Sequence, residues 1–225
     1  MFDAIAPRYD ALNHLLSAGL DRRWRRRAVR ELHLTGNEHV LDMCTGTADL
    51  AIELAAGPHG RARSVIGIDF AGAMLRLGLV KVRAAGLERT IHLARGDAMR
   101  APLRDRSCDA AVVAFGIRNV ADPAAACCEF ARVLRPGGRL AILEFGTPAI
   151  PGLRGAYQWY FRSILPRIGR ALSRHGSAYS YLPASVAQFP APPVFMEIIR
   201  TAGFHAVREV SLTFGVVSLF VAERD

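Results

Sequence analysis

The sequence has almost no lysine, and it lacks a long apolar run that is free of charge. Lys81 is the only lysine among 29 basic residues, so nearly all of the positive charge is arginine. No stretch of about 18 uncharged apolar residues occurs, which argues against a membrane-spanning helix. The N-terminus carries Asp3, Arg8 and Asp10 and shows no apolar h-region, so no signal peptide is expected. We therefore predict a cytoplasmic protein.

Cysteine is scarce as well, and its spacing excludes common uses. The four cysteines are Cys44, Cys108, Cys127 and Cys128. They form no C-x-x-C pair, and no cluster of His and Cys has the spacing of a zinc site. We expect no metal site, and reduced thiols fit a cytosolic protein.

Positive charge is in excess, with a formal net charge of 29 − 20 = +9 and a pI of about 10.2. Segments that bind nucleic acid usually mix lysine with arginine and concentrate them. Here arginine is spread along the chain, and we expect no nucleic-acid partner. The one dense run, from Arg22 to Arg27 around Trp24, has two interpretations. It is either a solvated helix face or a contact with an anionic partner such as phospholipid.

The apolar pattern predicts strands that alternate with helices. Residues 11–34 have the three- and four-residue spacing of a helix. The strands expected after it are 39–44, 64–70, 91–94, 109–115 and 139–145, and the helices between them are 49–56, 73–85 and 123–134. This alternation indicates βαβ units and a parallel sheet. The strands are apolar throughout, as expected where helices cover both faces.

The C-terminal part has a different pattern. Residues 196–202 are predicted to form a helix, followed by strands at 205–213 and 216–222. So short a connection between two strands predicts an antiparallel hairpin. The expected fold class is therefore α/β, a Rossmann-like, doubly wound sheet of seven strands that is mostly parallel and ends in an antiparallel hairpin.

We expect a single domain over residues 1–225. Within it, residues 1–36 are predicted to be an N-terminal helical lid. Residues 146–192 are rich in proline, glycine and aromatic side chains, and we interpret them as an insertion on the substrate side.

Ligands of open α/β sheets bind beyond the carboxyl ends of the strands, so the turn after the first strand is a candidate site. It runs from Asp42 through Gly46 and Thr47 to Ala48. With one glycine and no lysine, this loop matches neither the G-x-G-x-x-G fingerprint nor a P-loop. The Asp42 carboxylate would repel a pyrophosphate and tolerate a cation. This pattern favours S-adenosylmethionine, which carries positive sulfonium and ammonium groups.

Two further acids strengthen that interpretation. Asp69 ends the second strand, where a carboxylate can accept hydrogen bonds from both ribose hydroxyls. Asp97 ends the third strand, where it would face the adenine edge. Each acid has capping of the next helix as an alternative role. Acids at the ends of three successive strands nevertheless favour a shared ligand.

Motifs over nearly the whole chain resemble those of the ubiquinone/menaquinone biosynthesis C-methyltransferases, which are class I S-adenosylmethionine-dependent methyltransferases. The most specific motif is Phe115-Gly-Ile-Arg118-Asn119-Val120, because many methyltransferases share the loop at 41–49. The other matching segments are 2–13, 16–24, 132–138, 143–145, 165–169 and 179–182.

The resemblance implies which residues hold the cofactor. With the reasoning above, the expected set is Asp42, Gly46, Thr47, Asp69, Asp97 and Ala98. Two positions depart from the family pattern. Ala48 stands where a loop glycine is usual, so we expect the turn to change conformation. Ala114 stands where relatives often carry a serine that contacts the cofactor.

The resemblance also implies the reaction, which is C-methylation of a prenylated quinol ring by S-adenosylmethionine. A ring carbon becomes nucleophilic when the adjacent phenol loses its proton. The Arg118 guanidinium is suited to stabilise the phenolate, directly or through a water that takes the proton, although a surface salt bridge is the alternative. Asn119 is expected to hydrogen-bond a quinol oxygen, and Tyr9 is expected to be a lid residue at the catalytic site.

The resemblance points first to demethylmenaquinol as substrate and, as the alternative, to a benzoquinol of ubiquinone biosynthesis. Apolar side chains of residues 149–172 form the candidate groove for the prenyl chain, or else pack as an ordinary helix. A bilayer-resident substrate would give the Arg22–Arg27 run a role at the anionic cytoplasmic face of the membrane.

Two other functions remain open from the sequence. One is a methyltransferase for another small molecule or lipid. The other is a non-catalytic module that binds RNA or membranes on the same fold. The sequence also leaves open whether the chain forms a homodimer.

Overall fold

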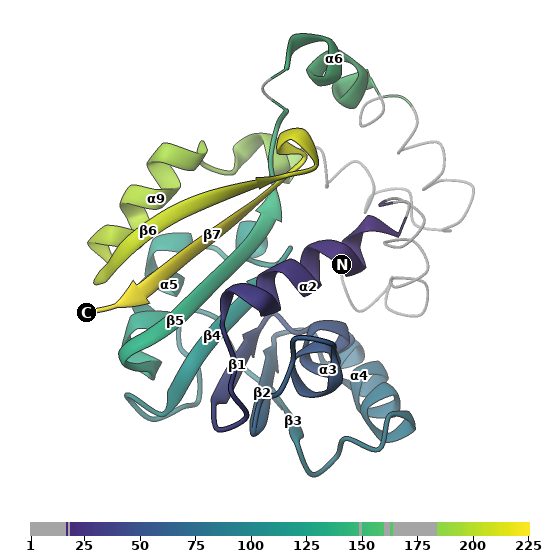
Figure 1. The fold of residues 1–225 in the computed structure, drawn as a ribbon, viewed down its shortest axis with the longest axis vertical. Coiled ribbons are helices and arrows are strands. Elements are labelled where there is room, and N and C mark those ends of the chain that lie inside the picture. The colour runs from purple at the N-terminus through teal and green to yellow at the C-terminus, as the bar shows by residue number, and fades with distance from the viewer. Residues whose placement is uncertain (1–16, 18, 149, 160–162, 164–183) are drawn as a thin grey trace.

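The computed structural model describes residues 17, 19–148, 150–159, 163 and 184–225 (Figure 1). Within them lie seven strands: β1 (His39–Met43), β2 (Ser64–Asp69), β3 (Ile91–Arg95), β4 (Cys108–Ala114), β5 (Leu134–Phe145), β6 (Phe204–Leu212) and β7 (Val217–Arg224). The α-helices with defined bounds are α2 (Leu20–Glu31), α3 (Asp49–Ala56), α4 (Gly72–Ala84), α5 (Pro123–Val133), α6 (Pro151–Trp159) and α9 (Pro192–Thr201). Short 3₁₀ helices occur at η1 (Ile117–Asn119) and η3 (Thr213–Gly215).

The strands form a single sheet in the order β3-β2-β1-β4-β5-β7-β6. Strands β1 to β5 are parallel, and Leu41 of β1 lies opposite Ile66 of β2 and Ala111 of β4. Strand β7 runs antiparallel to both β5 and β6. The order reverses between β1 and β4, which is where a doubly wound sheet binds its ligands. The predicted fold class and hairpin are confirmed.

Alternate residues of the central strands pack into two separate layers of helices. On one face, Leu41 and Val113 lie in a core with Phe130 of α5 and Phe195 of α9, and all four are fully buried. Burial of each such side chain contributes roughly 1.5–3 kcal/mol. The apolar character of whole strands is thereby explained, since neither face of the central sheet meets water.

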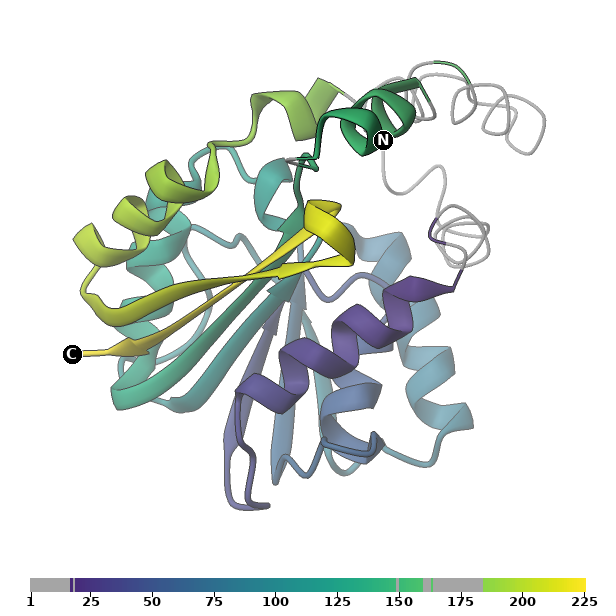
Figure 2. The ribbon, with the colours of Figure 1, turned by 45° about the horizontal axis from the view of Figure 1, so that its top comes forward.

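The other face carries α2, α3 and the buried side of α4. Here Val40 and Val112 pack with Trp24 and Val29 of α2 and with Leu54 of α3. Helix α2 crosses this face obliquely, in front of the sheet in Figure 1. Figure 2 shows α6 beyond the turn of the β6–β7 hairpin, on the side where the parallel strands end.

Three boundaries differ from the prediction for physical reasons. Strand β5 begins at Leu134 and not at residue 139, because Leu134 pairs with Cys108 before the turn that follows. Helix α9 begins at Pro192 and not at residue 196, since proline needs no hydrogen-bond acceptor in the first turn of a helix. The helix predicted over residues 11–34 is described as α2, which begins after Gly19, and its residues 11–16 lie outside the described part.

The predicted lid is only partly described. Helix α2 packs against β5, β7 and α3, so this part of residues 1–36 covers the face of the sheet. Residues 1–16 and 18 lie outside the described residues, and so do residues 149, 160–162 and 164–183 of the insertion at 146–192. Across the described ranges, no helix combines the length and the apolar character that a membrane span requires.

The arginine run on α2 is largely engaged within the protein. Arg25 pairs with Asp21 and Asp49, at 3.0 and 3.1 Å. The next two arginines pair with glutamates, Arg26 with Glu53 at 3.4 Å and Arg27 with Glu31 at 2.7 Å. The charges in the second half of the run are therefore partly neutralised within the protein, and contact with an anionic partner stays a prediction. Arg22 and Arg23 are exposed.

Candidate active site

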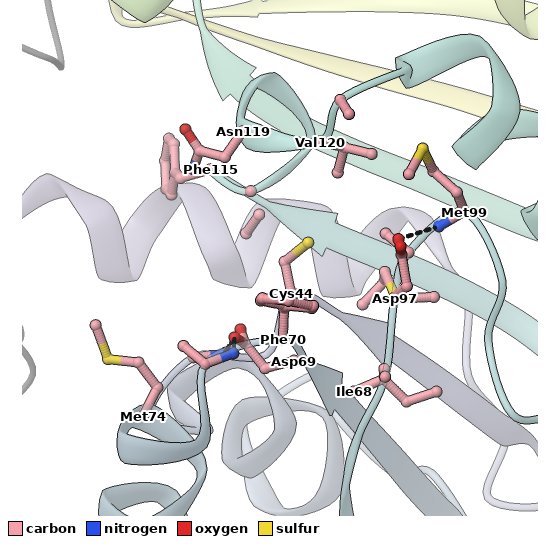
Figure 3. Close-up of a pocket in the computed structure, with 18 residues that line it drawn as sticks. Cys44, Ile68, Asp69, Phe70, Met74, Asp97, Met99, Phe115, Asn119 and Val120 are labelled. Carbon is pink, nitrogen blue, oxygen red and sulfur yellow. Dashed lines mark hydrogen bonds between the residues drawn. The ribbon is translucent and has the colours of Figure 1, made fainter. Parts of the chain in front are cut away.

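A cavity of about 330 Å³ opens at the carboxyl ends of β1, β2 and β4, at the reversal of strand order. Figure 3 shows Phe115 and Asn119 on one side of it and Asp69, Phe70 and Met74 across from them. The residues that line it come from four stretches of the chain, each at or just beyond the carboxyl end of one of the strands β1 to β4: Met43, Cys44, Gly46, Ile68, Asp69, Phe70, Ala71, Met74, Gly96, Asp97, Ala98, Met99, Ala114, Phe115, Gly116, Asn119, Val120 and Ala121.

Asp42 stabilises the loop after β1 from within the protein. This carboxylate is 1% exposed and accepts a hydrogen bond from the Thr45 hydroxyl at 2.6 Å. Burial raises its pKa to about 7, and the nearby Asp69 charge acts in the same direction. Asp42 is absent from the lining of the cavity. Its hydrogen bond supports the loop, and the direct ligand contact expected from the sequence stays a prediction.

Thr47 occupies a similar supporting position. It is 3% exposed, and its hydroxyl accepts a hydrogen bond from Lys81 at 3.2 Å. The same ammonium pairs with Asp49 in the first turn of α3. Like Asp42, Thr47 is not part of the cavity lining. The only lysine of the sequence thus ties the loop to α4.

Ala48 keeps the conformation that glycine would favour. It caps α3 with φ +66° and ψ 18°, in the left-handed region, and its side chain is fully buried. The expected change of conformation at this position is therefore wrong. A non-glycine residue in this region carries strain of about 1–2 kcal/mol.

Asp69 joins two turns of the site. One carboxylate oxygen accepts a hydrogen bond from the Gly46 amide at 2.9 Å, and the other accepts one from the Ala71 amide at 2.8 Å. Gly46 has a φ of +57°, and this conformation directs its N–H toward Asp69. Asp69 therefore connects the loop after β1 to the residue that precedes α4, at the edge of the cavity.

The loop after β3 supplies Asp97 and Ala98 to the same cavity. Asp97 is exposed and accepts a hydrogen bond from the Met99 amide at 2.9 Å. Next to Asp69, Phe70 is 69% exposed and has the Arg95 guanidinium 5.3 Å from the centre of its ring. An exposed aromatic ring on a cavity wall offers a flat apolar surface to a planar ligand.

The electrostatics of the lining suit a cationic ligand. Two carboxylates, Asp69 and Asp97, face a cavity whose described lining includes no lysine or arginine. Such a site disfavours a pyrophosphate and favours a ligand with sulfonium and ammonium groups. The remaining wall, with Met74 and Ile68, is apolar, as is usual for small-molecule sites.

The fourth strand leads into the specific motif through a close contact. Phe115 has a φ of +59°, and Gly116 follows it against the Cys44 side chain. A β-carbon at position 116 would lie 2.3 Å from the β-carbon of Cys44, which real side chains do not tolerate. Only glycine brings this turn so close to the loop after β1. Burial raises the pKa of the Cys44 thiol, so this side chain is neutral.

Arg118 lies behind the turn and is not part of the cavity lining. Its side chain is 8% exposed and forms an ion pair with the fully buried Glu144, with 2.7 Å between Nη1 and Oε1. Nη1 also donates to the Phe115 carbonyl, and Nε donates to the Ser185 hydroxyl at 3.3 Å. The salt bridge considered for Arg118 thus exists, but it is buried.

An aromatic cluster connects this turn to α2. The rings of Phe115 and Phe145 lie 4.6 Å apart, and Trp24 contacts both edge-on at 6.1 and 6.5 Å. The Trp24 indole donates to the Thr213 hydroxyl at 2.8 Å. Helix α2 therefore reaches the cavity wall through Trp24.

Four of the six residues predicted to bind the cofactor line one cavity: Gly46, Asp69, Asp97 and Ala98. Of the three predicted catalytic residues, Asn119 lines it, Arg118 lies behind it, and Tyr9 is outside the described residues. Ala114, where the family resemblance led us to expect a serine, also lines the cavity.

Sequence reasoning missed Glu144 and Cys44. Glu144 was noted only as part of a motif, although a charged residue within an apolar strand is itself a signal of a buried ion pair. Cys44 was noted only among the four cysteines and within the loop at 41–49, and its contact with Gly116 depends on two loops that are distant in the sequence.

The sheet order and the flanking helices are those of the Rossmann-like methyltransferases, and the cavity presents two carboxylates at the reversal of strand order. The family model described as "ubiE/COQ5 methyltransferase family" matches residues 1–224. The chain belongs to the ubiE/COQ5 methyltransferase family, and it is an S-adenosylmethionine-dependent methyltransferase.

Named relatives are similar to this chain over 98% to 100% of its length. The chain is 50% identical to the "Ubiquinone/menaquinone biosynthesis C-methyltransferase UbiE" of Syntrophotalea carbinolica, over 98% of this chain and 91% of the relative. It is 45% identical to the "Demethylmenaquinone methyltransferase" of Thermus thermophilus, over 100% of both.

Solved structures share the fold at low identity. A putative methyltransferase of Haloferax volcanii, solved with the activator Trm112, has a TM-score of 0.68 and 18% identity over 100% of this chain and 97% of that one. The [4+2]-cyclase SpnF has a TM-score of 0.70 and 17% identity over 100% and 93%. A cyclase on this fold illustrates that the fold alone does not define the reaction.

Proposed function

We propose that this protein transfers a methyl group from S-adenosylmethionine to a ring carbon of a prenylated quinol, with demethylmenaquinol as the substrate that yields menaquinol. The observation that carries the proposal is the cavity itself, which joins two carboxylates to the Phe115–Val120 motif at the point where the strand order reverses. The names of the relatives support the quinol, and the benzoquinol of ubiquinone biosynthesis is the second candidate.

The acidic side of the cavity would hold the cofactor. Asp69 lines the cavity with a carboxylate, a group that accepts hydrogen bonds from ribose hydroxyls, and Asp97 with Ala98 would face the adenine. Gly46 contributes an open backbone beside the cavity. When bound, the cofactor supplies an electrophilic methyl group on a positively charged sulfur. Asp42 and Thr47 would act indirectly, by fixing the loop.

The motif side would receive the quinol. Asn119 lines the cavity and is suited to hydrogen-bond a ring oxygen. The ring carbon gains nucleophilicity when its neighbouring phenol gives up a proton, and it loses its own proton after the new carbon–carbon bond forms. A guanidinium stays charged at any working pH and stabilises a phenolate, directly or through a water that takes the proton. We assign this role to Arg118.

The geometry around Arg118 fits that role. Nη1 and Nε are directed into the protein by Glu144, Phe115 and Ser185. Among the described residues no hydrogen bond engages Nη2, which leaves its two N–H groups for an oxygen of the substrate or of a water. Tyr9 remains a proposed lid residue.

Access from the membrane is the remaining part of the proposal. The exposed Arg22 and Arg23 would contact the anionic cytoplasmic face, each contributing about 1 kcal/mol near such a surface. The substrate-side insertion at 146–192 would receive the prenyl chain, and residues 1–36 would complete the single domain over the site.

Transfer of an isotopic methyl group tests the function. The protein is mixed with S-adenosylmethionine carrying a ¹³C methyl group, and in parallel with a demethylnaphthoquinol and a demethylated benzoquinol, each kept reduced. The expected product is the naphthoquinol with a labelled carbon–methyl bond, identified by its NMR shift. A labelled methoxy group, or no labelled product with either quinol, would refute the proposal, whereas preference for the benzoquinol would select the second candidate.

A further inference from the structure

We propose that Glu144 is a positioning residue for methyl transfer, which acts through Arg118 and touches neither substrate nor cofactor. The inference rests on the proposed function, because it assigns a reason for the orientation of Arg118. Glu144 lies near the end of β5, beside the turn that carries the Phe115–Val120 motif. Its side chain is 0% exposed, so it has no contact with solvent and lies outside the cavity lining.

The carboxylate of Glu144 binds Arg118 at two places. Oε1 accepts a hydrogen bond from the guanidinium Nη1 at 2.7 Å, and Oε2 accepts one from the Arg118 backbone amide at 3.3 Å. Oε1 also accepts one from the Phe145 amide at 2.8 Å. The carboxylate therefore fixes both the start and the end of the Arg118 side chain.

These contacts determine which guanidinium nitrogen is left over. Nη1 is shared between Glu144 and the Phe115 carbonyl, and Nε donates to Ser185 at 3.3 Å. The Phe145 ring lies beneath the guanidinium, with 5.4 Å from Cζ to the ring centre. The plane of the guanidinium is thus held at three points, and Nη2 is the nitrogen whose donors stay available within the described part of the chain. Without the Glu144 carboxylate, we expect the Arg118 side chain to rotate away from the quinol.

The burial of the pair argues for a role beyond stability. Two charges removed from water cost several kcal/mol each, and their attraction often does no more than offset that cost. An apolar pair would serve a merely structural purpose at this place at least as well. We infer that the pair instead fixes the orientation of the guanidinium toward the quinol. Hydrogen-bond donors that are already oriented toward a developing negative charge need no reorganisation during the reaction.

Glu144 is also unsuited to take the phenolic proton itself. Its two oxygens already accept from Arg118 and Phe145, and no surface of the side chain is open to a ligand. This excludes Glu144 as a base in direct contact with the quinol. Its contribution depends on Arg118, and that dependence can be measured.

A double-mutant cycle tests the dependence. Glu144→Gln, Arg118→Ala and the double variant are compared in kcat and KM for the quinol, and in Kd for S-adenosylmethionine by calorimetry. We expect Glu144→Gln alone to lower kcat about 10- to 100-fold, with less change in KM and an unchanged Kd. In the Arg118→Ala background the same substitution should cost less than about 3-fold, since the residue it positions is gone.

Two matched variants complete the test. Glu31 is a comparable control, because it is nearly buried and pairs with Arg27 and Arg208 away from the cavity. Glu31→Gln removes the charge from these ion pairs and should leave kcat unchanged. Ser185→Ala removes only the hydroxyl at Nε and should show a smaller loss of kcat that again disappears without Arg118. This variant decides the question if Glu144→Gln does not fold, as judged by thermal unfolding.

The proposal is overturned if Glu144→Gln folds and keeps the wild-type kcat, or if it costs as much with Arg118 absent as with Arg118 present. It is equally overturned if Glu144→Gln does not fold and Ser185→Ala leaves kcat unchanged. Failure of the proposed function looks different, because the wild-type protein would then form no C-methylated quinol in the first place.

Discussion

Gly116 and Cys44 are in such close contact that the two turns forming the cavity can approach each other only if position 116 has no side chain. An added β-carbon would stand 2.3 Å from the Cys44 β-carbon and 3.0 Å from its sulfur. The contact links the loop that would hold the cofactor to the motif that would hold the quinol. The specific motif and the general methyltransferase loop are therefore one structural unit.

This contact predicts the effect of Gly116→Ala. The substitution should lower the free energy of unfolding by about 1–3 kcal/mol, as overpacking usually does, and it should weaken S-adenosylmethionine binding because the turn moves away from the loop. Removing the obstacle with Cys44→Gly in the same protein should restore both, since glycine also accepts the φ of +56° at position 44. Thermal unfolding and calorimetry measure the two effects. A stable Gly116→Ala variant with normal binding would show that the contact is not needed.

Asp69 and Asp97 should differ in their importance for the cofactor. Asp69→Asn replaces one carboxylate oxygen with an NH₂ group, which cannot accept a hydrogen bond. The backbone N–H of either Gly46 or Ala71 then loses its acceptor. We expect the Kd for S-adenosylmethionine to rise about 10- to 100-fold, the equivalent of roughly 1.5–3 kcal/mol. Asp97→Asn is the matched comparison, with one backbone partner and more solvent, and its effect should be smaller. Equal effects would argue against the bridging role of Asp69.

Asp42 should make the stability of the protein depend on pH. Burial raises its pKa from the ordinary 3.8 to about 7, so between these values the folded protein keeps a proton that the unfolded chain releases. The contribution of this group to the free energy of unfolding therefore decreases as the pH rises from about 4 to about 7. Asp42→Asn has no such proton to lose, and its amide oxygen can still accept from Thr45.

Urea unfolding at pH 5 and pH 7.5 measures that difference. The wild-type protein should lose more stability than Asp42→Asn over this interval, by an amount on the order of a few kcal/mol. All other titrating groups are common to both proteins, so the difference reports Asp42. Identical changes in the two proteins would mean that the carboxylate is ionised in the fold at low pH.

Membrane contact through α2 should depend on its exposed arginines. Arg22→Gln combined with Arg23→Gln should reduce co-sedimentation with anionic phospholipid vesicles and leave thermal stability nearly unchanged. Arg27→Gln is the comparison, because Arg27 forms an ion pair with Glu31. This variant should reduce thermal stability more than the double variant does, and it should reduce vesicle binding less. If the double variant binds vesicles like the wild type, another surface must make the contact.

The sequence was sufficient for the elements and their order, because apolar strands and helical spacing are local properties. Even the bounds of α3, Asp49–Ala56, were predicted without error. Contacts between distant segments were harder to predict. Asp42 was assigned to the ligand because it adjoins the loop, yet the alternation of β1 turns its side chain into the protein, where Thr45 reaches it. Arg118 was placed in the site, but its buried partner Glu144 lies 26 residues away.

The central claim is that one cavity has a cofactor side, which depends on Asp69, and an acceptor side, which depends on Arg118. A single-turnover measurement of methyl transfer tests it most directly, with each enzyme saturated with S-adenosylmethionine before the quinol is added. For Arg118→Ala we expect the rate to fall about 100- to 1,000-fold, as on loss of a donor that stabilises a developing oxyanion, at an unchanged cofactor Kd. A variant that transfers the methyl group at the wild-type rate, or one that no longer binds the cofactor, would contradict the account.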